Sequence, residues 1–198
     1  MFKRLVIIPA RGGSKRIKNK NLKVIKNKEL ISFSIEAVIK SNIFSKIHVS
    51  SDSLKILKFS ETKGVKTDFL RPKKISNDNT PLFPVIKFVV EEYQKRKIKF
   101  DQVWLVYATN PFINKNIILD CKKKFEKQIR QNVLMTVTKY NYPIEWAHKI
   151  KKNGYLDPIF PNKLNMRSQD LTACYCDAGM INIYPSNLFY TKKKLIII

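Results

Sequence analysis

The stretch IIPARGGSKRIKNKN, residues 7–21, links a short apolar run to a loop that is rich in glycine and basic residues. The apolar run at residues 5–8 is followed by Gly12 and Gly13, a pattern that is typical of a buried strand ending in a loop. Paired glycines let a phosphate approach the backbone closely, and free amides in such a loop form an anion-binding nest. Two interpretations remain open at this stage: a loop that binds phosphate, or a tight solvated turn with surface lysines.

The glycine spacing of this loop matches neither the P-loop pattern GxxxxGK[ST] nor the dinucleotide pattern GxGxxG. Its side chains nevertheless supply positive charge and hydrogen-bonding groups for a triphosphate: Arg11, Ser14, Lys15, Arg16, Lys20 and Asn21. Charge of this kind attracts an anion without identifying which anion it is.

Apolar strands and amphipathic helices alternate along the chain up to residue 137. The expected strands are residues 5–8, 46–50, 65–69, 102–107 and 132–137. The expected helices are residues 30–41, 54–63, 81–96 and 116–128. This order predicts an α/β fold with a mainly parallel sheet, and in such sheets ligands bind outside the carboxyl ends of the strands.

Residues 138–166 break this alternation with three prolines and five aromatic side chains. We expect an excursion from the sheet at this point, either a β-arm or a dimer surface, because aromatic side chains are enriched at interfaces. The length and the absence of a linker or internal repeat favour one domain over residues 1–198.

The net charge of +24 comes mostly from lysine, which accounts for 32 of the 39 basic residues. A nucleic-acid-binding protein would usually concentrate arginine, or interleave aromatic and basic residues on one face. The lysines here are spread from Lys3 to Lys194, so a solvated surface is favoured over a nucleic-acid partner.

The three cysteines fit neither a disulfide framework nor a metal site by their spacing, and free thiols are typical of the cytosol. The amino terminus lacks a signal-peptide core, and no apolar run approaches the ~18 residues of a membrane helix. We therefore expect a cytoplasmic protein with no membrane partner.

Six segments, in register along residues 4–185, resemble the acylneuraminate cytidylyltransferases. They are IIPARGGSKRIKNKN, LISFSIEAVIKSNIFSKIHVSSDS, FLRPKKISND, YATNPF, YNYPIEWAHKI and MRSQDLTACYCDAGMINIY. The last two look most like the pseudaminic acid branch of that family. The resemblance implies a Rossmann-like nucleotidyltransferase fold of the nucleotide-diphospho-sugar transferase type. It also implies transfer of CMP from CTP to a nonulosonic acid, pseudaminic acid or a sialic acid, with release of pyrophosphate.

The resemblance also assigns roles to individual residues. The nucleotide-binding positions are Arg11, Gly12, Gly13, Ser14, Lys15, Asn21 and Arg71. The catalytic positions beside the phosphates are Arg11, Lys15 and Lys20, and the sugar-binding positions are Thr109, Asn110, Arg167 and Gln169. In this family the excursion forms a dimer interface, so a homodimer is implied.

Simpler alternatives stand beside several of these assignments. Arg71 precedes a proline and could cap a loop, and Asp170 and Asp177 are expected to be turn or cap residues. Asp52 is expected to cap the helix that begins at residue 54. Two histidines, in an apolar strand and beside Trp146, are expected to be structural: His48 and His148.

The sequence also departs from the family pattern. Its relatives carry a late Asp-Ile-Asp segment that holds Mg²⁺, whereas this sequence ends at Ile198 without one. The family therefore implies Mg²⁺, but the usual ligands of this ion are missing here. We expect a truncated carboxyl terminus. The alternative function is a catalytically impaired homologue that binds nucleotide-sugars. Cys176 also differs from both branches, which leaves the identity of the sugar open.

Overall fold

The structure is a computed structural model that describes residues 2–14, 16–127 and 132–190. It divides into two compact units, one made of Met1–Met135 with Gly179–Ile198 and the other of Thr136–Ala178. Each unit is described by itself. The expected arm at residues 138–166 falls within the second unit. That residues 1–198 form a single domain stays a prediction.

A five-stranded sheet is the centre of the first unit, with the strand order β4-β1-β5-β9-β6. The strands are β1 (Arg4–Pro9), β4 (Lys46–Ser50), β5 (Gln102–Val106), β6 (Leu134–Lys139) and β9 (Tyr175–Pro185). β1 pairs in parallel with both β4 and β5, whereas β5 pairs antiparallel with β9. The sheet is thus mostly parallel, and β1, with its apolar run at residues 5–8, lies in the interior of the sheet.

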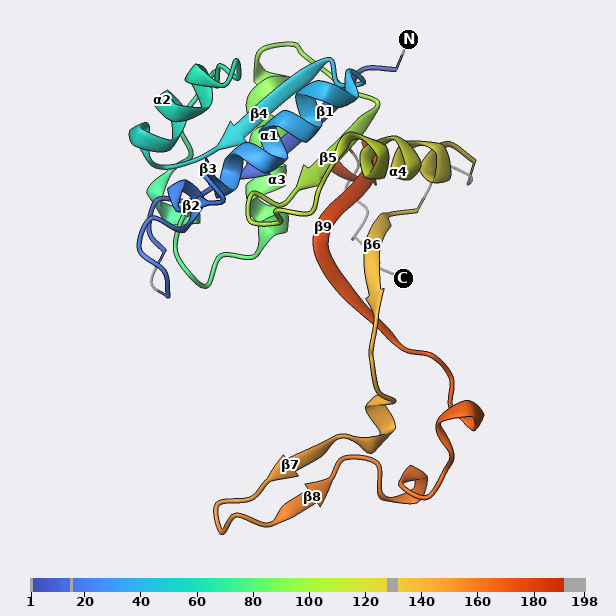
Figure 1. Cartoon of the computed structure of the whole chain (residues 1–198). Coiled ribbons are helices and arrows are strands. Elements are labelled where there is room, and N and C mark those ends of the chain that lie inside the picture. The colour runs from blue at the N-terminus through green and yellow to red at the C-terminus, as the bar shows by residue number, and fades with distance from the viewer. Residues whose placement is uncertain (1, 15, 128–131, 191–198) are drawn as a thin grey trace. The chain divides into compact units, whose positions relative to one another are not determined.

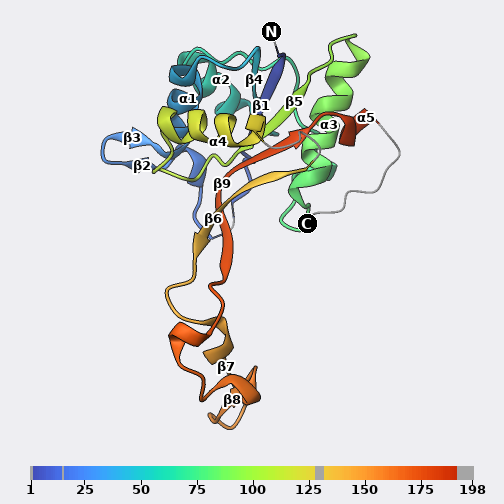
Figure 2. The same ribbon diagram turned by 90° about the vertical axis from the view of Figure 1, so that its right-hand side faces the viewer.

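Helices cover both faces of this sheet (Figures 1 and 2). One face carries α1 (Leu30–Ser41), α2 (Leu54–Thr62) and α4 (Lys115–Lys127), while the other carries α3 (Leu82–Lys95) and α5 (Asn187–Tyr190). Alternate side chains of β1 point to the two faces, which is why two separate hydrophobic cores form.

The two cores divide the side chains of β1 between them. Val6 and Ile8 pack with the apolar side of α1, α2 and α4, whereas Leu5 and Ile7 pack with α3. Trp104 of β5 is completely buried in the first core. These buried strands hold the loops at their carboxyl ends in fixed positions.

Short elements connect this framework. A hairpin of β2 (Val24–Ile25) and β3 (Lys28–Glu29) turns through two residues with positive φ, Lys26 and Asn27. Two of these elements are 3₁₀ turns. The turn η1 (Lys20–Leu22) follows the loop after β1, and the turn η2 (Lys73–Ile75) precedes α3.

The second unit contains a small antiparallel hairpin, while the β-arm expected at residues 138–166 stays a prediction. Its strands are β7 (His148–Ile150) and β8 (Leu156–Pro158), and Gly154 provides the positive φ that the turn requires. Three 3₁₀ turns complete this unit: η3 (Ile144–Trp146), η4 (Pro161–Lys163) and η5 (Ser168–Asp170). Whether this unit is a dimer surface stays a prediction.

Most predicted elements of the first unit are confirmed, and their bounds shift by at most two residues. One predicted strand, residues 65–69, is wrong: the segment is irregular and has no partner strand. Its apolar residue Val65 packs into the core, while Asp68 forms an ion pair with Lys46, so these contacts replace a ladder. The long strand β9 was not predicted. Residue 128 of the predicted fourth helix lies outside the described residues.

Within the described part of the chain, none of the helices has both the length and the apolar character needed to cross a membrane.

Candidate functional site

A pocket of about 210 Å³ opens in the first unit, beside the carboxyl ends of β1 and β5. Its walls come from the loop after β1, from η1, from the segment between β4 and α3, and from the loop after β5. The predicted residues among its lining are Arg11, Ser14, Lys20, Asn21, Arg71 and Thr109. Residues from distant parts of the sequence therefore meet where an α/β sheet is expected to bind its ligand.

The loop after β1 is held against the loop after β4 by a carboxylate. The backbone amide of Gly12 donates a hydrogen bond to Asp52 Oδ1 at 2.8 Å. A Cβ atom at position 12 would lie 2.8 Å from the Cβ of Ser53, so only glycine permits this close approach. The prediction that Asp52 caps α2 is wrong, because Ser53 occupies the N-cap position and Asp52 is used to fix the glycine loop.

Asn21 anchors the same loop from its other end. Its side chain is buried, and its Nδ2 donates a hydrogen bond to the carbonyl oxygen of Arg11 at 2.9 Å. Asn21 was predicted to contact the nucleotide; in the structure it positions the backbone of Arg11, and the nucleotide contact stays a prediction. A Cβ atom on Gly13 would meet nothing within 4 Å, so this glycine faces open space.

Arg71 is the buried charged residue among those that line the pocket. The residue is only 4% exposed, yet its Nε and Nη2 have no hydrogen-bond acceptor among the described residues. The nearest carboxylate oxygen, Oδ1 of Asp52, lies 3.9 Å from Nη2. Burial lowers the pKa of Arg71; the charge of Asp52 opposes this shift, and the charge of Arg11 adds to it. Because an arginine stays protonated even so, its buried donors require an acceptor that a ligand can supply.

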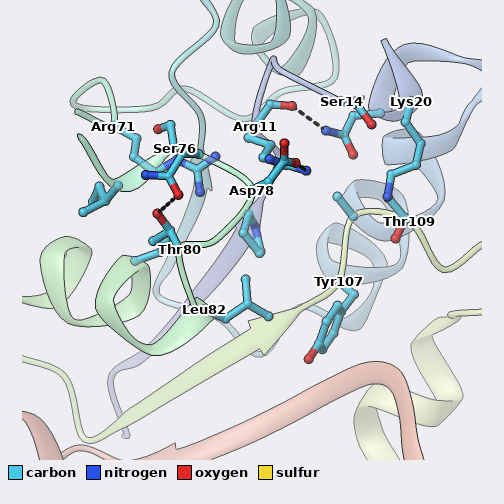
Figure 3. Close-up of a pocket in the computed structure, with 16 residues that line it drawn as sticks. Arg11, Ser14, Lys20, Arg71, Ser76, Asp78, Thr80, Leu82, Tyr107 and Thr109 are labelled. Atoms are coloured by element: carbon cyan, nitrogen blue, oxygen red, sulfur yellow. Dashed lines mark hydrogen bonds and ion pairs between the residues drawn. The ribbon is translucent and has the colours of Figure 1, made fainter. Parts of the chain in front are cut away.

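Arg11 and Lys20 place further positive charge around the same space. Figure 3 shows Arg11 in the middle of the pocket, with Arg71 on one side and Lys20 on the other. Arg11 forms an ion pair with Asp78. Ser14 also lines the pocket, whereas Lys15 lies outside the described residues.

The loop after β5 contributes the opposite wall. Ser34 of α1 donates a hydrogen bond to the carbonyl oxygen of Tyr107 at 2.8 Å, which fixes the start of this loop. Thr109 lines the pocket, but Asn110 is not part of the lining. The Asn110 side chain instead bonds within its surroundings, donating to the carbonyl oxygen of Gly179 and accepting from the amide of Phe112.

Sequence reasoning missed several residues that line this pocket: Ser76, Asn77, Asp78, Thr80 and Tyr107. The segment FLRPKKISND contains three of them, but only Arg71 was selected there, because it matches an arginine that the family places near the nucleotide. The signal that could have identified the others is the run of short polar residues that follows this arginine.

Comparison with known proteins agrees with this geometry. A family model described as Cytidylyltransferase matches residues 5–156. The chain belongs to the cytidylyltransferase family. A pseudaminic acid cytidylyltransferase from Campylobacter jejuni is 38% identical over 178 residues, which cover 90% of this chain and 76% of that protein. A CMP-N,N'-diacetyllegionaminic acid synthase from Legionella pneumophila is 26% identical over 193 residues, which cover 98% of this chain and 79% of that protein.

Solved structures of cytidylyltransferases share the fold. A CMP:2-keto-3-deoxy-manno-octonic acid synthetase complexed with CTP has a TM-score of 0.70. The match covers 95% of this chain and 76% of that structure at 17% sequence identity. The predicted α/β nucleotidyltransferase fold is therefore confirmed.

The sugar-binding residues that the family resemblance assigned fall in both units. Thr109 and Asn110 belong to the first unit, whereas Arg167 and Gln169 belong to the second. In the second unit Arg167 donates two hydrogen bonds to Asp170, from Nε at 2.8 Å and from Nη2 at 3.3 Å. Asp170 is thus a local partner of this arginine at η5, and the sugar contacts of the cytidylyltransferase stay predictions.

The described residues provide no ready-made cage for a metal ion. Within residues 2–14, 16–127 and 132–190, no three His, Cys, Asp or Glu side chains converge. The carboxylate that lines the pocket, Asp78, pairs with Arg11, and the nearby carboxylate of Asp52 accepts from the amide of Gly12. The residues of this cytidylyltransferase that the structure describes therefore do not fit a resident magnesium site.

The two histidines have structural environments. His48 is buried, its Nδ1 lies 3.1 Å from the hydroxyl oxygen of Tyr93, and burial lowers its pKa to about 3. His148 Nδ1 lies 2.8 Å from the carbonyl oxygen of Trp146. Neither side chain lines the pocket beside β1 and β5.

Proposed function

We propose that this chain transfers CMP from CTP to a nonulosonic acid and releases pyrophosphate. In this reaction the anomeric hydroxyl oxygen of the sugar attacks the α-phosphorus of CTP. A new P–O bond forms while the bond to the bridging oxygen of the β-phosphate breaks, and pyrophosphate leaves with that oxygen. The hydroxyl proton passes to solvent. Such catalysis depends mainly on positioning and on neutralising charge.

The observation that carries this proposal is the buried guanidinium of Arg71. Two of its donors lack an acceptor among the described residues, and Arg71 lines a pocket that already holds the charges of Arg11 and Lys20. The phosphates of a nucleotide supply the hydrogen-bond acceptors that Arg71 lacks and the negative charge that Arg11 and Lys20 attract. Arg11 and Lys20 then stabilise the charge that develops on the phosphates. Lys15 has the same proposed role, by resemblance.

The proposed acceptor is pseudaminic acid or a sialic acid, because the relatives' names specify nonulosonic acids of these kinds. Thr109 lies at the pocket wall that the acceptor would approach, and Asn110 belongs to the same loop. Arg167 is the proposed partner of the sugar carboxylate, since an arginine can bind a carboxylate through two parallel hydrogen bonds. Gln169 is proposed to contact the sugar beside it.

Magnesium is proposed as part of the substrate. The metal ion is expected to arrive bound to the phosphates of CTP, because phosphate oxygens are ligands that Mg²⁺ prefers. No step here depends on a metal ion held by the chain.

We also propose a homodimer located in the cytoplasm. The second unit exposes large apolar side chains, including Tyr142, Ile150, Tyr155 and Leu156, each more than 60% exposed. An exposed group of this kind supports an interface. The three cysteines are free thiols, which supports a reducing compartment.

The decisive experiment measures pyrophosphate release from CTP and Mg²⁺, with pseudaminic acid and N-acetylneuraminic acid offered in parallel. Release that depends on one sugar would establish the reaction and identify the substrate. CTP binding without release from either sugar would favour the impaired, nucleotide-binding homologue. A folded protein that does not bind CTP would contradict both possibilities.

A further inference from the structure

The arginine assigned to the phosphates is already paired with a carboxylate of the chain. Arg11 Nη2 forms an ion pair with Asp78 Oδ1, and the two side chains are 32% and 30% exposed. Both residues line the nucleotide pocket and also a second hollow beside it. Figure 3 shows the Asp78 carboxylate next to Arg11 in the middle of the pocket. A phosphate that approaches Arg11 therefore also comes close to the carboxylate of Asp78.

The backbone around Asp78 is shaped to present this carboxylate. The side-chain oxygen of Asn77 accepts hydrogen bonds from the amide of Asn79 at 3.0 Å and from the hydroxyl of Thr80 at 2.9 Å. These bonds close an Asx turn with Asp78 inside it. Ser76 fixes the segment on the other side, because its hydroxyl donates to the carbonyl oxygen of Pro72 at 2.9 Å.

The two carboxylates near the pocket have different roles. Asp52 accepts a hydrogen bond from the backbone of Gly12 and faces Arg71 at 3.9 Å, so it holds the loop together. Asp78 instead pairs with a side chain that the ligand itself needs. The charge of Arg11 also lowers the pKa of Arg71, so Asp78 neutralises one of two arginines that act on each other.

We propose that Asp78 competes with the phosphates of the ligand for Arg11. This inference rests on the proposed function. With the pocket empty, Asp78 keeps Arg11 in position. When a phosphorylated ligand binds, it must displace the carboxylate from Arg11 and overcome its repulsion, which lowers the affinity for every such ligand. When pyrophosphate leaves, Asp78 returns to Arg11, so the same side chain favours product release.

The test compares the binding of CTP and of inorganic pyrophosphate to purified variants by titration calorimetry at low salt. The variants are Asp78→Asn and Asp78→Ser, which remove the charge, and Asp78→Glu, which keeps it. Glu91→Gln is the matched control, because it removes the same charge from a half-exposed residue of α3 that pairs with Lys87. We expect both neutral variants to bind both ligands roughly two- to tenfold more tightly than the natural chain. The Glu variant and the control are expected to stay within about twofold of it.

Unchanged or weaker binding by the neutral variants would overturn the proposal, since Asp78 would then be neutral toward the ligand or would contact it favourably. An equal gain from Glu91→Gln would also overturn it, because bulk charge would explain the effect. Pyrophosphate binding without CTP binding would contradict the proposed function alone. The competition by Asp78 would then be judged from the pyrophosphate affinities of the variants. If neither the natural chain nor any variant binds either ligand, both proposals fail.

Discussion

At the scale of the residue, Arg71 shows how a ligand site can oppose stability. Its guanidinium is buried, and two of its donors have no acceptor in the part of the chain that the structure describes, an arrangement that costs free energy as long as no ligand is present. Nearby groups do not cancel this cost, because Asp52 is 3.9 Å away and Arg11 adds a like charge. The residue is therefore better explained by ligand binding than by the loop-capping role that the sequence also allowed.

This leads to a prediction for Arg71→Met, which keeps the length of the side chain and removes its charge. CTP affinity should fall by roughly ten- to hundredfold, because hydrogen bonds to a charged group contribute about 1.5–3 kcal/mol. The free energy of unfolding without nucleotide should stay the same or rise, because a poorly paired buried charge is lost. Calorimetric titration and urea denaturation measure the two quantities.

Arg96→Met serves as the control for Arg71→Met, since Arg96 is more exposed, pairs with Glu92 and is not among the residues that line the pocket. This variant should leave CTP affinity unchanged. A large loss of stability in Arg71→Met with unchanged affinity would show that Arg71 is a structural residue.

At the scale of the element, β4 and α3 are joined by a buried chain of hydrogen bonds. Tyr93 of α3 donates its hydroxyl proton to Asp68 Oδ2 at 2.6 Å, so its oxygen accepts from Nδ1 of His48 on β4. Lys46 completes the chain through its ion pair with Asp68 at 2.6 Å. Burial is the main cause that lowers the pKa of His48 to about 3; Asp68 opposes the shift, while Lys46 and Arg96 add to it.

A pH dependence of stability follows from this histidine. Its pKa is lower in the folded chain than the ordinary 6.5, so the unfolded chain binds the proton first as the pH falls. The stabilisation is complete above about pH 6.5 and is lost between that pH and about 3. From pH 7 to pH 5 the free energy of unfolding should fall by about 2 kcal/mol, before most carboxylates titrate. Urea denaturation across this range measures it.

The variant His48→Asn keeps a side-chain N–H donor near Tyr93 but cannot titrate. Its free energy of unfolding should therefore change little between pH 7 and pH 5. The matched variant His148→Asn alters the chain's second histidine, which lies on β7, and should behave like the natural chain. If His48→Asn retained the full pH dependence, the buried histidine would not be its source.

At the scale of the whole molecule, the sequence predicted what depends on local periodicity. The strand at residues 46–50 and the helix at residues 30–41 have the expected bounds, because each has a strong apolar pattern. The irregular segment at residues 65–69 has a similar pattern and lies beside the edge strand β4, but side chains make the contacts between them: Thr67 Oγ1 donates to the carbonyl oxygen of Val49 at 3.1 Å, and Asp68 pairs with Lys46. The antiparallel strand β9 depends on long-range pairing with β5, which periodicity does not reveal.

The site was predictable to the extent that its residues are chemically conspicuous. Basic and glycine residues of the first loop were identified because phosphate chemistry requires them. Asp52 and Asp78 were not assigned to the pocket, since their roles depend on contacts with Gly12 and Arg11 that only folding creates. A carboxylate beside an anion site is also the residue type that charge reasoning excludes first.

The last prediction concerns the oligomeric state. A hairpin in the second unit exposes Tyr155 and Leu156 at 70% and 64%, and such apolar area is normally covered by a partner. Sedimentation equilibrium should give a mass of twice the 23.2 kDa chain.

Leu156→Lys should shift the mass toward one chain, whereas Lys152→Ala, a change in the turn of the same hairpin, should not. The pocket proposed to bind CTP is lined by first-unit residues, so Leu156→Lys should still bind CTP, and this binding would show that the variant is folded. A single-chain mass for the natural protein at micromolar concentration would contradict the dimer.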